Sequence, residues 1–193
     1  MKKLIWLLTL CFVADCYAQD WYRDGDTVCA GGITYNVKVD KYSVILSNTA
    51  NKLPTDGKLY YKNGSEIVAQ DEYEAVFGHS VPGSVERALR NTFTSDEIAP
   101  LWDVKESQMS ICYLVSPEGD TMEVVFVVNN IPEMLAIPPE KFALLERNLK
   151  KYVKWNVSAQ GRKVKYIDGW SPVNFWHMLL LPPDNPIFEK VTF

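Results

Sequence analysis

Hydrophobic and polar residues alternate along much of the first third of the chain. The clearest alternation runs from Ile33 to Val39, and shorter apolar runs cover Tyr42 to Leu46 and Lys58 to Tyr61. A period of two is typical of strands with one buried face, and the Asn63-Gly64 pair that follows is a strong hairpin-turn signal. The pattern therefore predicts a β-meander in an N-terminal β-rich segment, residues 19–70.

Two β-branched runs in the middle of the chain predict a hairpin. Met109 to Val115 and Met122 to Val128 flank a turn at Pro117 to Asp120. Apolar runs separated by a Pro- and Gly-containing turn favour antiparallel pairing. Because the second run is almost continuously apolar, we expect burial on both faces and a place at the centre of the sheet.

Helical spacing is found on both sides of this hairpin. Residues 82–92 place Val85 and Leu89 four apart, with Pro82 at the expected first turn, and residues 65–77 show the same period in part. Proline is favoured at the start of a helix because it has no N–H to satisfy there. We therefore expect a helix over 82–92.

The segment 140–152 has the strongest helical pattern. Phe142, Leu145 and Leu149 share one face, prolines precede the segment, and basic residues fill its last turn. This arrangement predicts an amphipathic helix packed on the hairpin. Residues 162–168 and 173–181 then return to strand-like composition, and the proline-containing tail is expected to be extended or irregular.

The order of these elements resembles the C-terminal domain of TonB-type proteins. The resemblance covers roughly residues 82–176 and includes the hairpin, the helix, Lys154 to Val157, the Gln160-Gly161 turn and a last strand at Val173 to Phe175. It implies three antiparallel strands with helices on one face. Energy-transducing TonB proteins also have an uncleaved membrane helix and a long Pro-rich spacer, which we do not find, so the resemblance implies an architecture and not transport.

The predicted fold class is therefore α+β. An N-terminal β-meander precedes a TonB-C-terminal-like antiparallel sheet, residues 71–193, with helices packed on one face. The whole chain also resembles uncharacterised secreted proteins of similar length from gut Bacteroides, a family whose name implies no function.

The first residues have the pattern of a signal peptide, residues 1–18. Lys2 and Lys3 precede an apolar run from Leu4 to Ala14, and Ala18 fits a cleavage site. An apolar run of this length is shorter than the roughly 20 residues that span a bilayer core. We therefore expect an exported protein, periplasmic or extracellular.

A second interpretation of this region places Cys16 at the start of a lipid-anchored chain. Val13 to Cys16 resembles a lipobox, although Asp15 stands where such a motif has a small residue. On this interpretation the protein would be attached to the outer membrane.

The charge of the chain argues against nucleic acid as a partner. The formal net charge is −4, and removal of Lys2, Lys3 and Asp15 with the signal peptide makes it −5. Basic residues form no run longer than a pair, whereas binding to phosphate backbones needs a dense basic surface.

Two cysteines, Cys29 and Cys112, remain after the expected cleavage. In an oxidising compartment they could form one disulfide, which would stabilise a loop of this length by roughly 3–5 kcal/mol. The alternative is two separate buried thiols, since free cysteine is commonly buried.

The chain contains no motif that identifies a reaction. His79 and His177 are its only histidines, and neither has a neighbouring Cys or carboxylate at metal-ligand spacing. No Gly-x-Ser-x-Gly sequence is present; Ser84 after Pro82-Gly83 is better explained by a helix start. We assign no catalytic, metal-binding or cofactor-binding residue and favour a non-enzymatic protein.

Tryptophans are the more informative residues. Trp170 and Trp176 near the C-terminus are candidates for a binding face, because indoles anchor interfaces and stack on sugars; the alternative is that they fill the core. We expect an envelope protein that binds a protein or peptide by adding a strand to an exposed sheet edge. The alternatives are a carbohydrate-binding or hydrolytic protein with a Trp-lined cleft, and a purely structural envelope protein.

Overall fold

The computed structural model describes residues 21–52, 58–68, 76 and 78–178 of the 193-residue chain. The expected signal peptide, Cys16 and the tail beyond Met178 lie outside the described residues. So does the predicted boundary between residues 70 and 71, and most of the segment 65–77.

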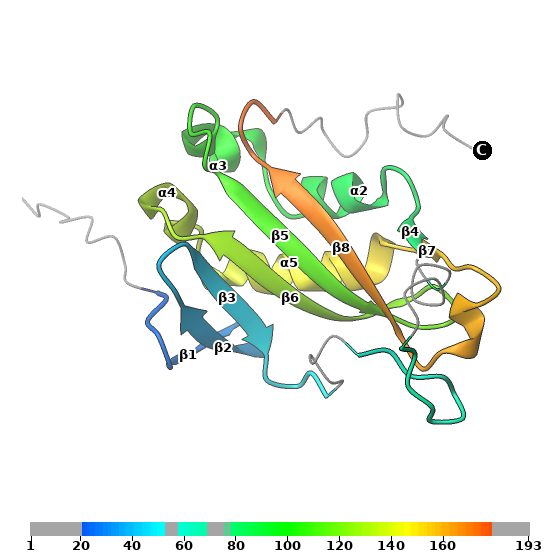
Figure 1. The fold of residues 1–193 in the computed structure, drawn as a ribbon. Helices are drawn as coiled ribbons and strands as arrows, with labels where there is room; N and C mark the ends of the chain where they lie inside the picture. The colour runs from blue at the N-terminus through cyan, green and yellow to red at the C-terminus, as the bar shows by residue number, and fades with distance from the viewer. Residues whose placement is uncertain (1–20, 53–57, 69–75, 77, 179–193) are drawn as a thin grey trace, which may run out of the picture.

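One antiparallel sheet of six strands forms the centre of the protein (Figure 1). The N-terminal meander supplies three neighbouring strands, and the hairpin and a last strand supply the other three. In spatial order the strands are β1 (Thr27–Ala30), β2 (Ile33–Val39), β3 (Ser43–Asn48), β6 (Thr121–Asn129), β5 (Gln108–Val115) and β8 (Ile167–Asn174). The α+β fold class is confirmed, and the predicted hairpin, β5 and β6, is internal to the sheet.

The meander joins the hairpin edge to edge. Strand β3 pairs with β6, with Leu46 opposite Phe126 and Val44 opposite Val128. The sheet is thus twice as wide as the three strands that the TonB-like pattern implies. The predicted strand at Lys58 to Tyr61 forms only isolated bridges, although the Asn63-Gly64 turn is present, with the Tyr61 N–H donating to the Ser65 carbonyl at 2.8 Å.

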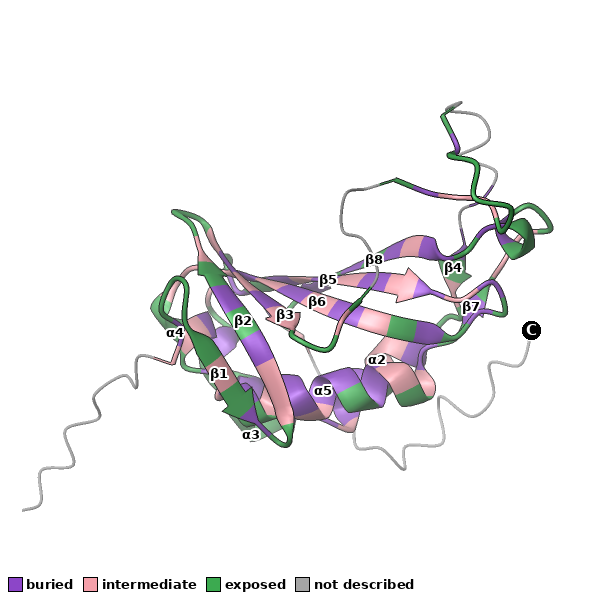
Figure 2. Ribbon diagram, turned by 90° about the horizontal axis from the view of Figure 1, so that it is seen from below, coloured by how far each residue is buried: buried purple, intermediate pink, exposed green. Residues whose placement is uncertain are grey.

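Helices cover one face of this sheet, as predicted (Figure 2). The two expected helices are α5 (Pro139–Tyr152) and α2 (Ser84–Arg90). As expected, Ser84 lies at the start of α2: Gly83 is the N-cap, Ser84 is the first helical residue, and its hydroxyl donates to the Val81 carbonyl at 2.6 Å. The smaller elements are α3 (Ser95–Ile98), η1 (Ala99–Leu101), α4 (Pro132–Leu135), η2 (Gly161–Lys163) and a two-stranded sheet of β4 (His79–Ser80) and β7 (Trp155–Asn156).

The core lies between α5 and the sheet. Phe142 of α5 packs on Phe126 of β6 with ring centroids 5.3 Å apart, and Tyr35 of β2 lies 6.4 Å from Phe126. On the opposite face of the sheet, Val125 and Val127 are only half-buried. The expected burial of β6 on both faces is therefore wrong, because the helices cover one face alone.

The C-terminal strands differ from the prediction. Residues 162–168 and 173–181 were expected to be separate strands, but a 3₁₀ turn, η2, is followed by one strand over Ile167–Asn174. Pro172 lies inside this strand. An edge strand accepts a proline because one row of its N–H groups has no partner within the sheet.

A buried carboxylate fixes α5 to the meander. Glu146 is 1 % exposed and accepts hydrogen bonds from the Tyr35 hydroxyl at 2.7 Å, the Asn48 amide at 2.8 Å and Lys150 at 2.7 Å. Burial and the adjacent Glu146 charge raise the pKa of the Tyr35 hydroxyl, so that it remains a donor. Three donors from three elements thus satisfy a charge that would be costly to bury alone.

Replacing Glu146 with alanine should destabilise the protein by about 3 kcal/mol, because the Tyr35 hydroxyl and the Asn48 amide would lose their partner. Denaturant unfolding of the Glu146→Ala variant measures this loss. Glu140→Ala, at an exposed position of the same helix, should change the free energy of unfolding by no more than about 0.5 kcal/mol. Equal losses in both variants would show that the network does not hold α5 in place.

Candidate functional site

The candidate site is the outer edge of β8. Strand β8 pairs with β5 on one side, and none of the described residues pairs with it on the other. The Phe175 N–H, one residue beyond the strand, donates to the Ser107 carbonyl at 2.9 Å. Along an antiparallel strand, the backbone N–H and C=O groups of successive residues point alternately to one neighbouring strand and to the other. The backbone groups of the odd-numbered residues of β8 therefore point to β5, and those of the even-numbered residues point away from the sheet.

Three residues of β8 with backbone groups that point outward are counted at this edge: Trp170, Pro172 and Asn174. All three offer a carbonyl, but Pro172 has no N–H. The proline thus removes one outward donor and no bond to β5, which explains why β8 tolerates it. These three residues consequently supply three acceptors and two donors.

Trp170 stands out from this edge on the face without helices. Its side chain is 59 % exposed. Trp170 begins a row of cross-strand neighbours that continues with Cys112 of β5 and Val125 of β6. The next row on the same face consists of Pro172, Ser110, Val127 and Ile45. We call the apolar members of both rows the open-face patch: Trp170, Pro172, Cys112, Val125, Val127 and Ile45.

The opposite face of β8 is closed by Trp155. A Cβ atom added at Gly169 would lie 2.4 Å from the Trp155 ring, so only glycine fits there. The indole packs on Tyr113 with ring centroids 5.1 Å apart and donates to the Thr121 hydroxyl at 3.1 Å. Trp155 is a core residue that supports β8.

The second sequence candidate, Trp176, belongs to a different group of side chains. It lies 4.6 Å from the His177 ring, which in turn lies 6.5 Å from Trp102, and both indoles are 39 % exposed. His177 has φ of +54°, an uncommon value for a residue with a side chain. Trp176 is six positions after Trp170, about 20 Å of extended chain, so the two form separate contact points rather than one platform.

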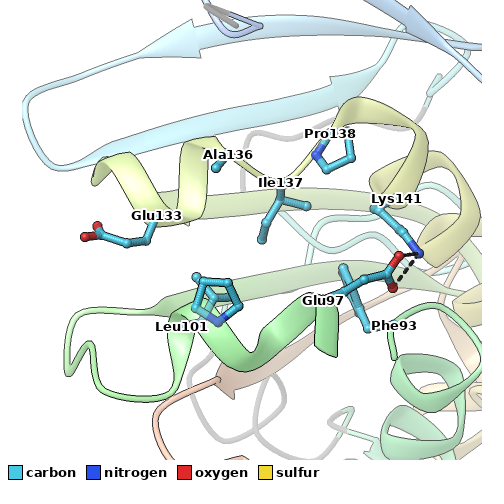
Figure 3. Close-up of a pocket in the computed structure, with 9 residues that line it drawn as sticks. Phe93, Glu97, Leu101, Glu133, Ala136, Ile137, Pro138 and Lys141 are labelled. Carbon is cyan, nitrogen blue, oxygen red and sulfur yellow. Dashed lines mark hydrogen bonds and ion pairs between the residues drawn. The ribbon is translucent and has the colours of Figure 1, made fainter. Parts of the chain in front are cut away.

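A cavity lies elsewhere, between α3, α4 and the start of α5 (Figure 3). It has a volume of about 290 Å³. Phe93, Leu101 and Ile137 contribute its apolar surface, and Glu97, Glu133 and Lys141 its charged groups. None of its lining residues is a tryptophan.

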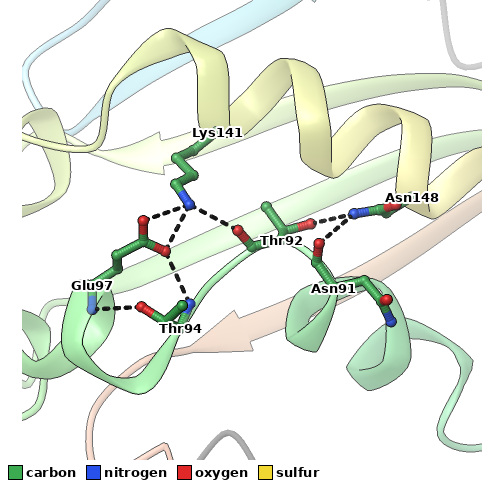
Figure 4. Close-up of polar contacts among 6 residues, drawn as sticks. All are labelled: Asn91, Thr92, Thr94, Glu97, Lys141 and Asn148. Atoms are coloured by element: carbon green, nitrogen blue, oxygen red, sulfur yellow. Dashed lines mark hydrogen bonds and ion pairs between the residues drawn. The ribbon is translucent and has the colours of Figure 1, made fainter. Parts of the chain in front are cut away.

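Two charged groups of this cavity, Lys141 and Glu97, belong to a network of polar contacts that joins the helices (Figure 4). Lys141 donates to the Thr92 carbonyl at 3.0 Å and to Glu97 at 2.6 Å, and Asn148 donates to the Asn91 carbonyl at 3.0 Å. Burial raises the pKa of Glu97, but hydrogen bonds from Lys141 and Thr94 outweigh it and leave the pKa below its ordinary value. Lys141 and Glu97 thus form a structural ion pair.

The described residues form no recognisable catalytic or metal centre. No three His, Cys, Asp or Glu side chains among them come together as metal ligands. His79 pairs through its backbone with Asn156, and His177 lies between the two indoles. No described helix has the length and apolar character needed to cross a membrane.

Comparison with known proteins places the chain in a family. The model of the domain of unknown function DUF5043 matches residues 19–170. The chain belongs to the DUF5043 family. A crystal structure of a DUF5043 family protein from Bacteroides uniformis ATCC 8492, at 1.85 Å resolution, is similar over 80 % of this chain and 93 % of that one, with 22 % identity and a TM-score of 0.63. No curated protein matches the chain.

The two cysteines in the described part of this DUF5043 protein are not paired with each other. Cys29 and Cys112 are both free. They lie on β1 and β5, which are separated by β2, β3 and β6, a distance of about 19 Å at the usual strand spacing. The disulfide considered from the sequence is therefore wrong, since bridged Cα atoms lie within about 7 Å of each other.

Sequence reasoning found Trp170 but not the pattern of the edge. The direction of each N–H depends on how β8 aligns with β5, and one hydrogen bond, from Phe175 to Ser107, fixes it. Pro172 was the available signal, because a proline inside an otherwise strand-like segment indicates an edge.

The thiols of Cys29 and Cys112 in this DUF5043 protein should react at different rates. Burial and the negative charge of Asp168 raise the pKa of the Cys112 thiol, whereas Cys29 is exposed. Iodoacetamide should therefore modify Cys29 faster in the folded protein, by about tenfold or more, as measured by mass spectrometry of peptides. The rates should converge in denaturant. A peptide in which the two cysteines are joined would contradict the structure.

Proposed function

We propose that this DUF5043 protein is a non-enzymatic binding protein that adds an extended segment of another protein to its sheet beside β8. The observation that carries the proposal is the eight-residue edge strand whose even-numbered backbone groups point away from the sheet. Such an edge is a template for a further strand.

The edge combines main-chain and side-chain recognition. The three carbonyls of Trp170, Pro172 and Asn174 and the two N–H groups of Trp170 and Asn174 can bond to a partner strand, each bond contributing about 0.5–1.5 kcal/mol. Trp170 adds a large, exposed indole on the open face, and tryptophan is enriched among residues that dominate binding energy. Pro172 extends the apolar surface beside it. Strand addition therefore offers both affinity and a preference for apolar side chains.

The proposed place of action is the cell envelope. This rests on the signal peptide pattern of residues 1–18, with the lipid anchor at Cys16 as the second interpretation. The TonB-like pattern of hairpin, helix and last strand is consistent with a binding role and stays a prediction.

A carbohydrate site is the less supported alternative. It requires at least two exposed indoles around one concave surface, with carboxylates nearby. Trp102 and Trp176 are exposed, but the cavity beside α3 is not lined by them, and Trp155 is buried in the core. The peptide-binding proposal accounts for both Trp170 and the outer edge of β8.

Amide hydrogen exchange, followed by NMR, tests the proposed site. A saturating eight-residue peptide of alternating Thr and Val should slow exchange at Trp170 and Asn174 by about tenfold or more. The amides of Gly169, Ser171 and Val173, which already bond to β5, should be protected with or without the peptide.

The control is the same peptide with every backbone N–H methylated. It keeps its side chains, but its methyl groups remove every backbone donor and prevent its backbone from approaching β8 closely, so it should protect neither the Trp170 nor the Asn174 amide. Equal protection by both peptides, or protection confined to β1, would contradict strand addition at β8.

A further inference from the structure

A group of basic side chains lies at the start of β8. We call Lys62, Arg162, Lys163 and Lys165 the basic cluster; all four are exposed. Backbone hydrogen bonds join the loop before residue 66 to the end of η2 and to the residues after it. The Lys62 N–H donates to the Lys163 carbonyl at 2.9 Å, and the Lys165 N–H donates to the Tyr60 carbonyl at 2.8 Å. Residues about 100 positions apart in the sequence thus form one basic surface.

This basic surface is largely unneutralised within the described part of the chain. Lys62 lies 3.9 Å from Glu118, the outer limit of an ion pair. Among the described residues, no carboxylate forms an ion pair with Arg162, Lys163 or Lys165. Lys165 lies over the Tyr60 ring at 5.8 Å. In a chain of net charge −4, a local excess of positive charge favours an acidic partner.

The position of the cluster relates this charge to the direction of a bound strand. Every pairing in the six-stranded sheet is antiparallel, and antiparallel pairs are slightly more stable than parallel ones. A strand antiparallel to β8 begins near Asn174 and ends near Ile167. Its C-terminal end therefore lies beside Arg162, Lys163 and Lys165.

We infer that the partner of β8 is an extended, apolar segment with acidic side chains at its C-terminal end. The inference rests on the proposed function and names the chemistry and direction of its ligand. The apolar residues of the partner lie beside Trp170 and Pro172 on the open face. Its carboxylates lie beside the basic cluster, where they steer association and fix the direction of pairing.

Three labelled peptides test this inference against the full chain by fluorescence polarisation. Each has a core of six alternating Thr and Val residues and neutral, blocked termini. One core is followed by two Glu, one is preceded by two Glu, and one is followed by two Gln. The peptide with C-terminal Glu should bind about five- to tenfold more tightly than the Gln peptide in low salt, and this advantage should shrink in 0.3 M salt. N-terminal Glu should give little or no gain.

The outcomes separate the inference from the proposed function. Equal binding of all three peptides would overturn the acidic preference and leave strand addition standing. A preference for N-terminal Glu would overturn the antiparallel direction. No binding of any peptide at millimolar concentration would overturn both proposals.

Charge reversal provides the matched variants. In Arg162→Glu combined with Lys163→Glu, the preference for C-terminal Glu should disappear, while binding of the Gln peptide should stay unchanged. Lys38→Glu, an exposed site on β2 at the other side of the sheet, should keep the preference. Arg162→Gln with Lys163→Gln provides a milder second variant, and circular dichroism checks that each protein is folded. Retention of the full preference in both double variants would overturn the role of the basic cluster.

Discussion

The buried carboxylate of Glu146 is the constraint on which the arrangement of this protein depends. A charge that is 1 % exposed must be neutralised by hydrogen bonds, and its donors come from β2, from β3 and from α5 itself. These bonds determine which side of α5 faces the meander, so that Phe142 meets Phe126. The apolar side of α5 packs on one face of the sheet. No helix covers Val125 and Val127 on the other face, and they are therefore only half-buried.

The order of the strands then places β8 at the edge. The chain passes from the hairpin through α5 and returns beside β5, the only side of the hairpin that the meander leaves free. Gly169 and Trp155 close the helix side of β8, because the indole occupies the space of a Cβ atom. Trp170, one residue later in an alternating strand, must point the opposite way. The packing that buries one tryptophan therefore exposes the other.

Local pattern predicted the elements but not how they combine. The hairpin and α5 were predictable because their period and turn residues are contained within short segments. The pairing of Leu46 with Phe126 and the burial of Glu146 under Tyr35 join residues about 80 and 111 positions apart, and no local signal encodes them. Sequence alone identified Trp170 as a candidate, whereas the basic cluster depends on a turn near residue 62 lying against residue 163.

Pro172 also bears on which strand can pair with this edge. If two copies of β8 paired about a two-fold axis, each copy would place a proline in the new ladder, and two N–H donors would be missing from the pairing. If β8 paired with a strand of another protein that has no proline, only the donor at Pro172 would be missing. Pro172 therefore disfavours pairing between two copies of β8 more than it disfavours pairing with a strand that contains no proline.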